Sequence, residues 1–324
     1  MKKIKALALS AGLASVALLG LQLTQAQTKT LVIGMAQANN AEPWREAMNS
    51  QLTSAAKKMN MQLTIADARQ DNSKQVADVE RFIQQKVDLL IISPNEAAPL
   101  TSVVKKAYDS GIPVIVLDRA VLGDAYTMFI GADNKLIGQK AGAYVAKWCR
   151  TNKHVPCNIL EITGLSGSPP SADRGSGFRK GLAANRNAKI IASPTSEWLR
   201  EKAVPVAAAA FQANARIDVV YGHNDPSAEG GYLAAKNAGK DLSKILFVGI
   251  DALPSPDGGI MSVIEGRLGA SYVYPTGAAE AIEWANKILT QNAKPPKKVV
   301  LGTTEVYPSN AMAICKQYDC PAAK

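Results

Sequence analysis

Charged residues recur just after the predicted strands of this chain, at positions that often belong to functional sites. Asp118 and Arg119 directly follow the apolar run Val114–Leu117, and Arg174 and Asp251 follow later strand-like runs. Ligands of open α/β sheets bind outside the carboxyl ends of the strands. These carboxylates and guanidiniums therefore predict a polar ligand held at a sheet edge.

The complete set of candidate contacts combines acceptors, donors and flat aromatic faces. Carboxylates accept hydrogen bonds, guanidiniums donate them and amides do both, which matches the hydroxyl groups of a sugar or polyol. Aromatic rings can cover the C–H faces of a sugar ring. The candidate ligand-binding residues are Asn40, Trp44, Arg45, Asp118, Arg119, Arg174, Trp198, Asn224, Asp251 and Tyr274.

Structural interpretations compete with several of these assignments. Asp118 and Arg119 could form a surface ion pair, and Trp44 could pack at a helix start. Asp225 fits a helix cap before Pro226 better than a ligand contact. The prediction of a site therefore rests on the shared position of these residues at strand ends.

Apolar runs of strand length alternate with segments of helical spacing along nearly the whole chain. Pro43–Met59 and Ser73–Gln85 place their apolar residues on one helical face, and Ser73 is the expected cap of the second helix. This alternation predicts βαβ units and parallel sheets covered on both faces. The expected strands are Leu31–Met35, Leu63–Ala66, Leu89–Ile92, Val114–Leu117, Met128–Ile130, Ile159–Ile162, Ile190–Ala192, Val219–Tyr221, Leu246–Ile250 and Val299–Leu301.

These strands are too many for one small doubly wound domain, so the sequence predicts two α/β domains. The first is expected over residues 27–132 plus about 275–298, and the second over residues 133–274 plus about 299–324. No Gly/Ser-rich or Pro-rich linker separates them, which favours several short crossings over a single tether.

Residues 1–26 have the pattern of a secretory signal peptide. Three lysines, Lys2, Lys3 and Lys5, precede the mostly apolar stretch Ala6–Leu23, and Thr24–Ala26 offers a small residue at the cut. A membrane anchor is the weaker alternative, because no basic cluster follows. We therefore expect cleavage near Ala26 and export of the mature chain.

The formal net charge is +10, and the signal peptide contributes three of these charges. The remaining basic residues are scattered and interleaved with acids, which predicts a solvated surface and no nucleic-acid partner. The four cysteines form two local pairs, Cys149/Cys157 and Cys315/Cys320. In an oxidising compartment these pairs predict two disulfides, and their spacing matches no common zinc site.

Signatures of enzymes do not occur in the sequence. The segment Gly164–Ser168 misses the nucleophile-elbow pattern because its final residue is serine. A dinucleotide fingerprint, a P-loop and an HExxH helix are also missing. We expect a binding protein without cofactor or metal, and a hydrolase or isomerase is the least favoured alternative.

Five short motifs occur in a characteristic order over residues 30 to 310. They are strand-Pro-Val-x-x-Leu-Asp-Arg at 112–119, Ile-Gly-Ala-Asp-Asn at 130–134, Ala-Asp-Arg-Gly-Ser-Gly-Phe at 172–178, His-Asn-Asp at 223–225 and Gly-Ile-Asp at 249–251. In this order they resemble the periplasmic sugar-binding proteins of ABC importers, of the ribose- and galactofuranose-binding type. The resemblance implies a type I periplasmic binding protein: two Rossmann-like, doubly wound parallel-sheet domains joined by three crossings, with a ligand cleft between them.

The resemblance also implies roles for individual residues. Asp118 and Arg119 match the family's pair that hydrogen-bonds sugar hydroxyls, and Arg174 matches its second-domain arginine. Asn224 and Asp251 match its asparagine and its late aspartate.

Aromatic positions of the family are matched less closely. Trp44 and Trp198 fall where the family places stacking aromatics. Arg45 stands where the ribose type has a second aromatic and the galactofuranose type has arginine, and Tyr274 falls near a hinge glutamine. Around Asn39–Glu42 the alignment is loose by one residue, so the assignment of Asn40 depends on it.

The implied function is that of a soluble, monomeric periplasmic protein. It captures a monosaccharide or related polyol and delivers it to an ABC permease. A sensing subunit with the same cleft, reporting to a sensor kinase or chemoreceptor, is the alternative.

Overall fold

The computed structural model describes residues 29–321, and the predicted signal peptide lies outside the described residues. Two parallel sheets organise the described chain, which confirms the predicted α/β class. The six-stranded sheet has the order β11-β5-β4-β3-β1-β2, and the four-stranded sheet has the order β7-β6-β8-β9. The strands are β1 Val32–Gln37, β2 Gln62–Asp67, β3 Leu89–Ile92, β4 Val114–Leu117, β5 Met128–Ala132, β6 Cys157–Ile162, β7 Ala188–Ala192, β8 Val219–Gly222, β9 Leu246–Val248 and β11 Lys298–Leu301, with an antiparallel pair of β10 Ser271–Tyr272 and β12 Glu305–Val306.

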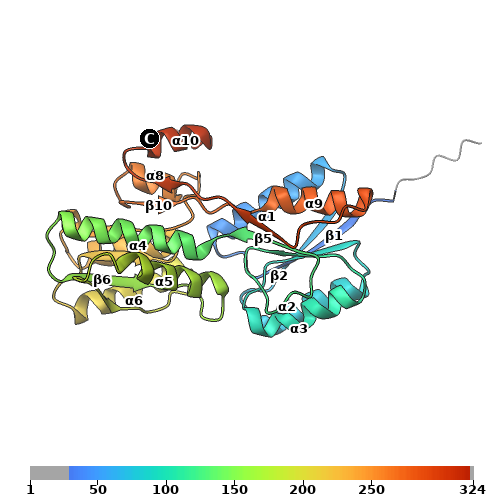
Figure 1. Cartoon of the computed structure of the whole chain (residues 1–324), viewed down its shortest axis with the longest axis horizontal. Coiled ribbons are helices and arrows are strands. Elements are labelled where there is room, and N and C mark those ends of the chain that lie inside the picture. The colour runs from blue at the N-terminus through green and yellow to red at the C-terminus, as the bar shows by residue number, and fades with distance from the viewer. Residues whose placement is uncertain (1–28, 322–324) are drawn as a thin grey trace, which may run out of the picture. The chain divides into compact units, whose positions relative to one another are not determined.

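We call the six-stranded sheet and its helices the first lobe. Helices α1 (Pro43–Lys58) and α9 (Ala278–Gln291) cover one face, and α2 (Asn72–Gln84) and α3 (Ala97–Asp109) cover the other (Figure 1). Alternate strand residues enter the two cores: Ile115 packs on the α1/α9 side and Val116 on the α2/α3 side. This alternation explains why β4 is an uninterrupted apolar run.

We call the four-stranded sheet and its helices the second lobe. Residues of α4 (Asn134–Thr151) and α5 (Pro169–Leu182) pack in one core with Ile159 of β6. The neighbouring residue Leu160 lies in the other core with residues of α6 (Arg200–Ala213) and α7 (Asp225–Asn237). Two short helices, α8 (Gly259–Ile264) and α10 (Ala311–Gln317), contribute to that second core.

Helices α4 and α5 pack backbone to backbone through glycines at four-residue spacing. A Cβ atom at Gly138 would lie 2.2 Å from the carbonyl oxygen of Arg174, and one at Gly142 would lie 2.2 Å from that of Phe178. On α5, a Cβ atom at Gly177 would lie 2.1 Å from the carbonyl oxygen of Lys135. This close approach brings the start of α5 against the start of α4.

Three chain segments cross between the lobes. The first links β5 to α4, the second links β10 to α9, and the third links β11 to β12. The third crossing differs from the sequence expectation, which placed the boundary near residue 298. Because β11 pairs with β5 in the six-stranded sheet, that boundary falls after Leu301.

Two local predictions are wrong. Asp71, not Ser73, caps α2, because its carboxylate accepts hydrogen bonds from the backbone N–H groups of Ser73 and Lys74. The disulfide between Cys149 and Cys157 forms as predicted. Cys315 and Cys320, however, are free thiols.

The two free cysteines lie in and just after α10. Cys315 lies in α10, and the backbone N–H of Cys320 donates to its carbonyl oxygen at 2.9 Å. In residues 29–321 no helix combines the length and apolar character that crossing a membrane requires.

Candidate ligand-binding cleft

A small cavity lies between the two lobes. It is lined by Glu42, Trp44, Arg45, Asp118, Arg119, Pro170, Arg174, Trp198, Asn224, Asp251 and Tyr274. Nine of the ten sequence-predicted residues thus lie around one cavity. The exception is Asn40.

The parallel sheets and helix starts explain why these residues meet. In the first lobe, Asp118 and Arg119 leave the carboxyl end of β4, and Trp44 and Arg45 lie in the first turn of α1. Asp118 has a positive φ of 68° and donates its backbone N–H to the carbonyl oxygen of Ile130, so the chain turns sharply here.

The second lobe supplies its residues from equivalent positions. Arg174 lies near the start of α5, and Asn224 is the N-cap of α7, where its side chain accepts from the N–H of Ser227. Asp251 follows β9 with a φ of 130°, which is unusual for a residue with a side chain. Such strained positions cluster at binding sites.

The Asp118 carboxylate accepts three side-chain hydrogen bonds on the first-lobe side of the cavity. One carboxylate oxygen, Oδ1, accepts a hydrogen bond from the Tyr274 hydroxyl at 2.7 Å. The other, Oδ2, accepts from Arg45 Nη2 at 3.1 Å and from the Ser93 hydroxyl at 3.3 Å. Asp118 is 6% exposed, so this buried carboxylate is satisfied by a fixed set of donors.

Arg45 is held mainly by its own lobe. Its Nη1 donates to Gln37 Oε1 at 2.7 Å and to the Ser93 hydroxyl at 2.9 Å, and its Nε donates to Glu42 Oε1 at 3.1 Å. The side chain is 1% exposed. Arg45 therefore orients Asp118 and Glu42 at the cavity wall.

Glu42 is a cavity residue that the sequence prediction did not include. It is the N-cap residue of α1, and its Oε1 accepts from Asn39 Nδ2 at 2.7 Å and from Arg119 Nη2 at 3.3 Å. Burial alone would raise the pKa of Glu42, but the guanidiniums of Arg45 and Arg119 outweigh it and lower that pKa. The carboxylate is therefore ionised at neutral pH.

Asn40 lies away from the cavity. It is exposed, and its side-chain oxygen accepts from Asn49 Nδ2 at 2.8 Å. The segment turns because the Asn39 side chain accepts from the N–H groups of Ala41 and Glu42. Pro43 begins the helix and so marks Glu42 as the residue just before it. This was the sequence signal that favoured Glu42 over Asn40 as the cavity residue.

Arg119 and Arg174 bring a guanidinium from each lobe. Arg119 Nη1 donates to the carbonyl oxygen of Asn95 at 2.9 Å, and burial together with Arg45 lowers the pKa of Arg119 to about 10. Arg174 Nε donates to Asn134 Oδ1 at 2.8 Å, and its Nη1 donates to the carbonyl oxygen of His223. Arg119 therefore stays charged at neutral pH.

Asp251 is the main second-lobe acceptor at the cavity. Its Oδ1 lies 3.9 Å from Arg174 Nη1 and the residue is 5% exposed. Burial raises the pKa of Asp251 well above its ordinary value, although Arg174 opposes the shift.

Asp225 has a supporting role beneath Asp251. It accepts from the Ser271 hydroxyl at 2.6 Å and from the Ala252 N–H at 2.7 Å, and burial raises its pKa to about 7. Asp225 thus holds the turn after Asp251. It is not the expected cap of α7, because Asn224 is the N-cap and Asp225 is the first residue of the helix.

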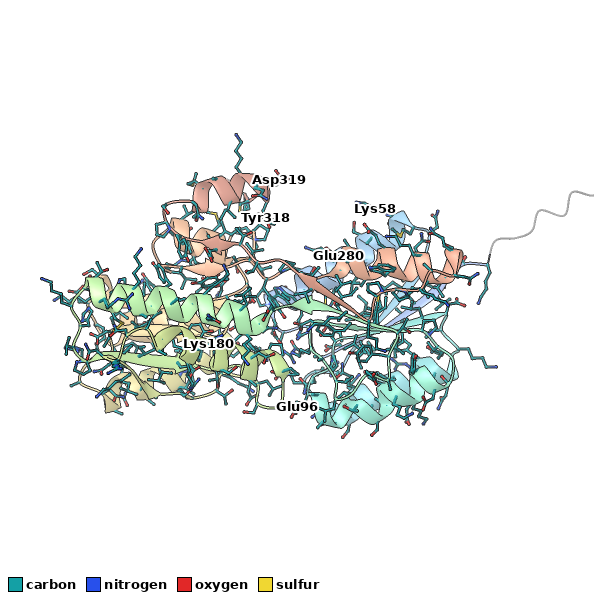
Figure 2. All side chains as sticks on the ribbon, viewed as in Figure 1. Lys58, Glu96, Lys180, Glu280, Tyr318 and Asp319 are labelled. Atoms are coloured by element: carbon teal, nitrogen blue, oxygen red, sulfur yellow. A yellow bond between two sulfur atoms is a disulfide. The ribbon has the colours of Figure 1, made fainter. Side chains whose placement is uncertain are left out.

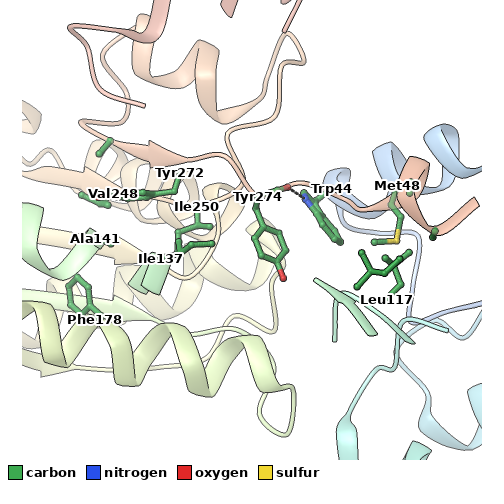
Figure 3. Packing of buried hydrophobic residues seen from close by; sticks show 14 of the residues in the cluster. Trp44, Met48, Leu117, Ile137, Ala141, Phe178, Val248, Ile250, Tyr272 and Tyr274 are labelled. Atoms are coloured by element: carbon green, nitrogen blue, oxygen red, sulfur yellow. Dashed lines mark hydrogen bonds between the residues drawn. The ribbon is translucent and has the colours of Figure 1, made fainter. Parts of the chain in front are cut away.

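Aromatic rings cover the cavity from both lobes. The Trp198 ring lies 5.5 Å from the Arg119 guanidinium carbon and 5.4 Å from that of Arg174. Trp44 and Tyr274 lie side by side with ring centroids 5.1 Å apart, and Trp44 Nε1 donates to the backbone oxygen of Tyr274 at 2.7 Å (Figure 3). Trp44 and Trp198 are 4% and 3% exposed, so both rings are buried.

Tyr274 connects groups from both lobes at the second crossing. Besides donating to Asp118, its hydroxyl accepts from Asn134 Nδ2 at 3.1 Å. Burial, with the nearby Asp118 carboxylate, raises the pKa of Tyr274, so the hydroxyl keeps its proton.

The lobes also touch outside the cavity. Gln70 Nε2 donates to the carbonyl oxygen of Glu197 at 3.2 Å, and the backbone N–H of Ala97 donates to the carbonyl oxygen of Gly167 at 3.2 Å. Glu96, labelled in Figure 2, lies so close to Gly167 that a Cβ atom there would be 2.3 Å from its carboxylate. The structure therefore has the lobes closed on the cavity.

This arrangement suits a neutral, hydroxyl-rich ligand. Three carboxylates and three guanidiniums line the cavity, so the formal charges balance. Among the described residues no group of three or more histidine, cysteine or acidic side chains could hold a metal ion.

Comparison with known proteins places this architecture in a family. The periplasmic binding protein domain model matches residues 33–256. The galactofuranose-binding protein YtfQ of Escherichia coli K12 is 31% identical over 289 residues, covering 87% of this chain and 89% of that protein. The ribose import binding protein RbsB of the same organism is 28% identical over 262 residues, covering 80% and 84%.

Solved structures agree with the sequence relatives. The fructose-binding periplasmic domain of a hybrid two-component system has a TM-score of 0.84 and 40% identity, covering 89% of this chain and 94% of that one. A galactofuranose-binding protein has a TM-score of 0.84 and 30% identity, covering 89% and 98%. The relatives named here are binding proteins, which supports the expectation that this chain is not an enzyme. The chain belongs to the periplasmic binding protein family, as its motifs indicated.

Proposed function

We propose that this protein captures a monosaccharide or related polyol in the interlobe cavity and delivers it to an ABC permease. The proposal depends on one observation: each lobe pairs an acid with an arginine at the cavity. Asp118 pairs with Arg119 in the first lobe, and Asp251 pairs with Arg174 in the second. Each pair offers an acceptor and a donor to neighbouring hydroxyls, and Trp44 and Trp198 offer apolar ring faces. Glu42 is proposed as a further acceptor.

A sugar in its furanose form is the preferred ligand class. Structures similar to this chain at 28–40% identity are described as binding fructose, β-D-fucofuranose, galactofuranose and arabinofuranose. Two structures at 24% identity bind myo-inositol and carry less weight for the ligand.

Isothermal titration calorimetry of the mature protein tests this function. The panel holds D-fructose, L-arabinose, D-galactose, D-ribose and myo-inositol, with a nucleoside as an unrelated ligand. We expect saturable binding of at least one sugar and none of the nucleoside. Tight nucleoside binding without sugar binding would contradict the proposal.

A sensing role is the second candidate, and one observation favours it. The structural neighbour with 40% identity is the periplasmic domain of a hybrid two-component system. Adjacent permease and ATPase genes would favour transport, whereas an adjacent sensor kinase gene would favour sensing. Both roles use the same cavity.

Export and domain motion complete the proposal. We propose that the signal peptide of residues 1–26 is cleaved and that the protein acts as a monomer in the periplasm. The lobes, residues 27–132 plus about 275–301 and the remainder of the mature chain, would close around the ligand.

A further inference from the structure

A second concave surface lies beside the cavity, on the other side of Trp198. We call it the outer groove, and it has an open volume of about 720 Å³. Its walls are mainly apolar and come from both lobes: Pro43 from the first, and Leu199, Val204 and Leu233 from the second. Trp198 lines both the outer groove and the cavity.

Residues that are neighbours in sequence line the two spaces. Glu42 lines the cavity, whereas its neighbours Ala41 and Pro43 line the outer groove. In the same way, Asn224 lines the cavity and Pro226 lines the groove. Trp198 therefore stands between the two spaces, and a disaccharide that occupies both requires the Trp198 segment to shift.

Two buried donors near the groove have no acceptor. In the described part of the chain, five buried side-chain polar atoms have no hydrogen-bond partner, and two of them are Trp198 Nε1 and Arg200 Nε. Both residues line the outer groove. A buried donor without an acceptor costs free energy. Both atoms are covered in this structure, so a ligand oxygen would pair with them once the Trp198 segment shifts.

The segment carrying Trp198 is also strained. Glu197 and Trp198 have positive φ angles of 52° and 77°, which bulky residues rarely adopt. The Trp198 ring is seated against Gly164, where a Cβ atom would lie 2.2 Å from it. Strain of this kind is typical of segments that position or release a ligand.

We propose that the outer groove is a subsite for a second sugar unit, so that the protein also binds a disaccharide whose first ring occupies the cavity. Apolar walls suit the C–H face of a ring, and the two donors suit its hydroxyl oxygens. A purely apolar partner would leave both donors unpaired. The subsite rests on the proposed sugar-binding function and extends it.

Calorimetry with matched probes tests the subsite. D-fructose is compared with levanbiose, and L-arabinose with α-1,5-arabinobiose, because each disaccharide repeats the monosaccharide. We expect a disaccharide to bind at least as tightly as its monosaccharide. Leu233→Lys, in the groove, should weaken disaccharide binding about tenfold by removing apolar contact and leave monosaccharide binding unchanged.

Two further variants make the result decisive. Ala41→Trp fills the exposed first-lobe side of the groove and should weaken disaccharide binding in the same way. Met312→Lys introduces the same charge at a residue that is 63% exposed on α10, and should change neither affinity. Monosaccharide titration of each variant shows that it is folded.

The outcomes separate the two proposals. Monosaccharide binding without disaccharide binding would overturn the subsite alone, as would equal loss of both affinities in Leu233→Lys. Absence of binding by every sugar would overturn the sugar-binding function and the subsite with it.

Discussion

At the scale of single residues, Arg174 is the donor that ties the second lobe to the cavity. In the proposed complex, Arg174→Ala removes charge-assisted hydrogen bonds to the ligand while α5 and its glycine packing stay intact. We expect sugar affinity to fall by about 3 kcal/mol, roughly a hundredfold. Calorimetry measures the affinity, and circular dichroism shows that the variant is folded.

A control on the same helix isolates the effect. Lys180 is exposed on α5, and Lys180→Ala should leave affinity unchanged. Equal affinity in wild type and Arg174→Ala would remove Arg174 from the site.

Asp251 predicts the pH dependence of binding. Burial in the closed cavity without a ligand raises its pKa, so the carboxyl group there holds its proton above the ordinary aspartate range. Hydroxyl donors of a bound sugar stabilise the ionised form, so binding releases a proton. Affinity should therefore rise as pH rises through the elevated pKa.

Titrations between pH 5 and 8 in buffers with different ionisation enthalpies measure this proton release. Asp251→Asn should bind more weakly and lose the Asp251 part of the pH dependence. Affinity that falls with rising pH would contradict the assignment of Asp251 as an acceptor.

Residue types at strand ends were enough to predict most of the residues that line the cavity. Asp118, Arg174 and Asp251 follow or lie near strand ends, and topology alone brings such positions together. Asn40 and Glu42 show the limit of this reasoning. Which residue of a turn faces the cavity depends on local hydrogen bonds, here those of Asn39, and sequence spacing does not fix them.

At the scale of elements, the contact of α4 with α5 depends on glycine. A Cβ atom at Gly142 would lie 2.2 Å from the carbonyl oxygen of Phe178, which is backbone and cannot easily move. Gly142→Ala should lower the free energy of unfolding by about 2–3 kcal/mol through overpacking. Urea denaturation measures the change.

Gly302 provides the control for this substitution. No atom lies within 4 Å of a Cβ atom placed there, and its φ is not in the left-handed region. Gly302→Ala should be neutral or slightly stabilising. Similar destabilisation by both substitutions would contradict the packing argument.

The disulfide fixes the end of α4 to the start of β6. Its cysteines are separated by 8 residues, and closing so short a loop stabilises by about 2–3 kcal/mol. Thiol titration of the unfolded, unreduced protein should find two thiols, Cys315 and Cys320, and reduction should raise the count to four. A count of zero before reduction would show that the second predicted disulfide forms after all.

Strands were predicted more closely than the ends of elements. Leu89–Ile92 and Val114–Leu117 match β3 and β4 because buried parallel strands are continuous apolar runs. The cap of α2 was missed, and the third crossing was placed before β11 when it follows Leu301. Asp71 and Ser73 are both good capping residues, and a strand of the first lobe that follows α9 can be assigned only when its partner β5 is known.

At the scale of the whole molecule, the central claim is that one sugar is held by both lobes at once. Residues of each lobe line the cavity, and Tyr274 links Asp118 with Asn134 at a crossing. Such a site is complete only when the lobes are closed, so ligand binding should stabilise the closed arrangement.

The most direct test is a crystal structure of the mature protein with the tightest-binding sugar of the panel. We predict density for one sugar ring in the cavity, with hydroxyls bonded to Asp118 and Arg119 on one side and to Arg174 and Asp251 on the other. A sugar held by only one lobe, or bound outside the cavity, would contradict the account.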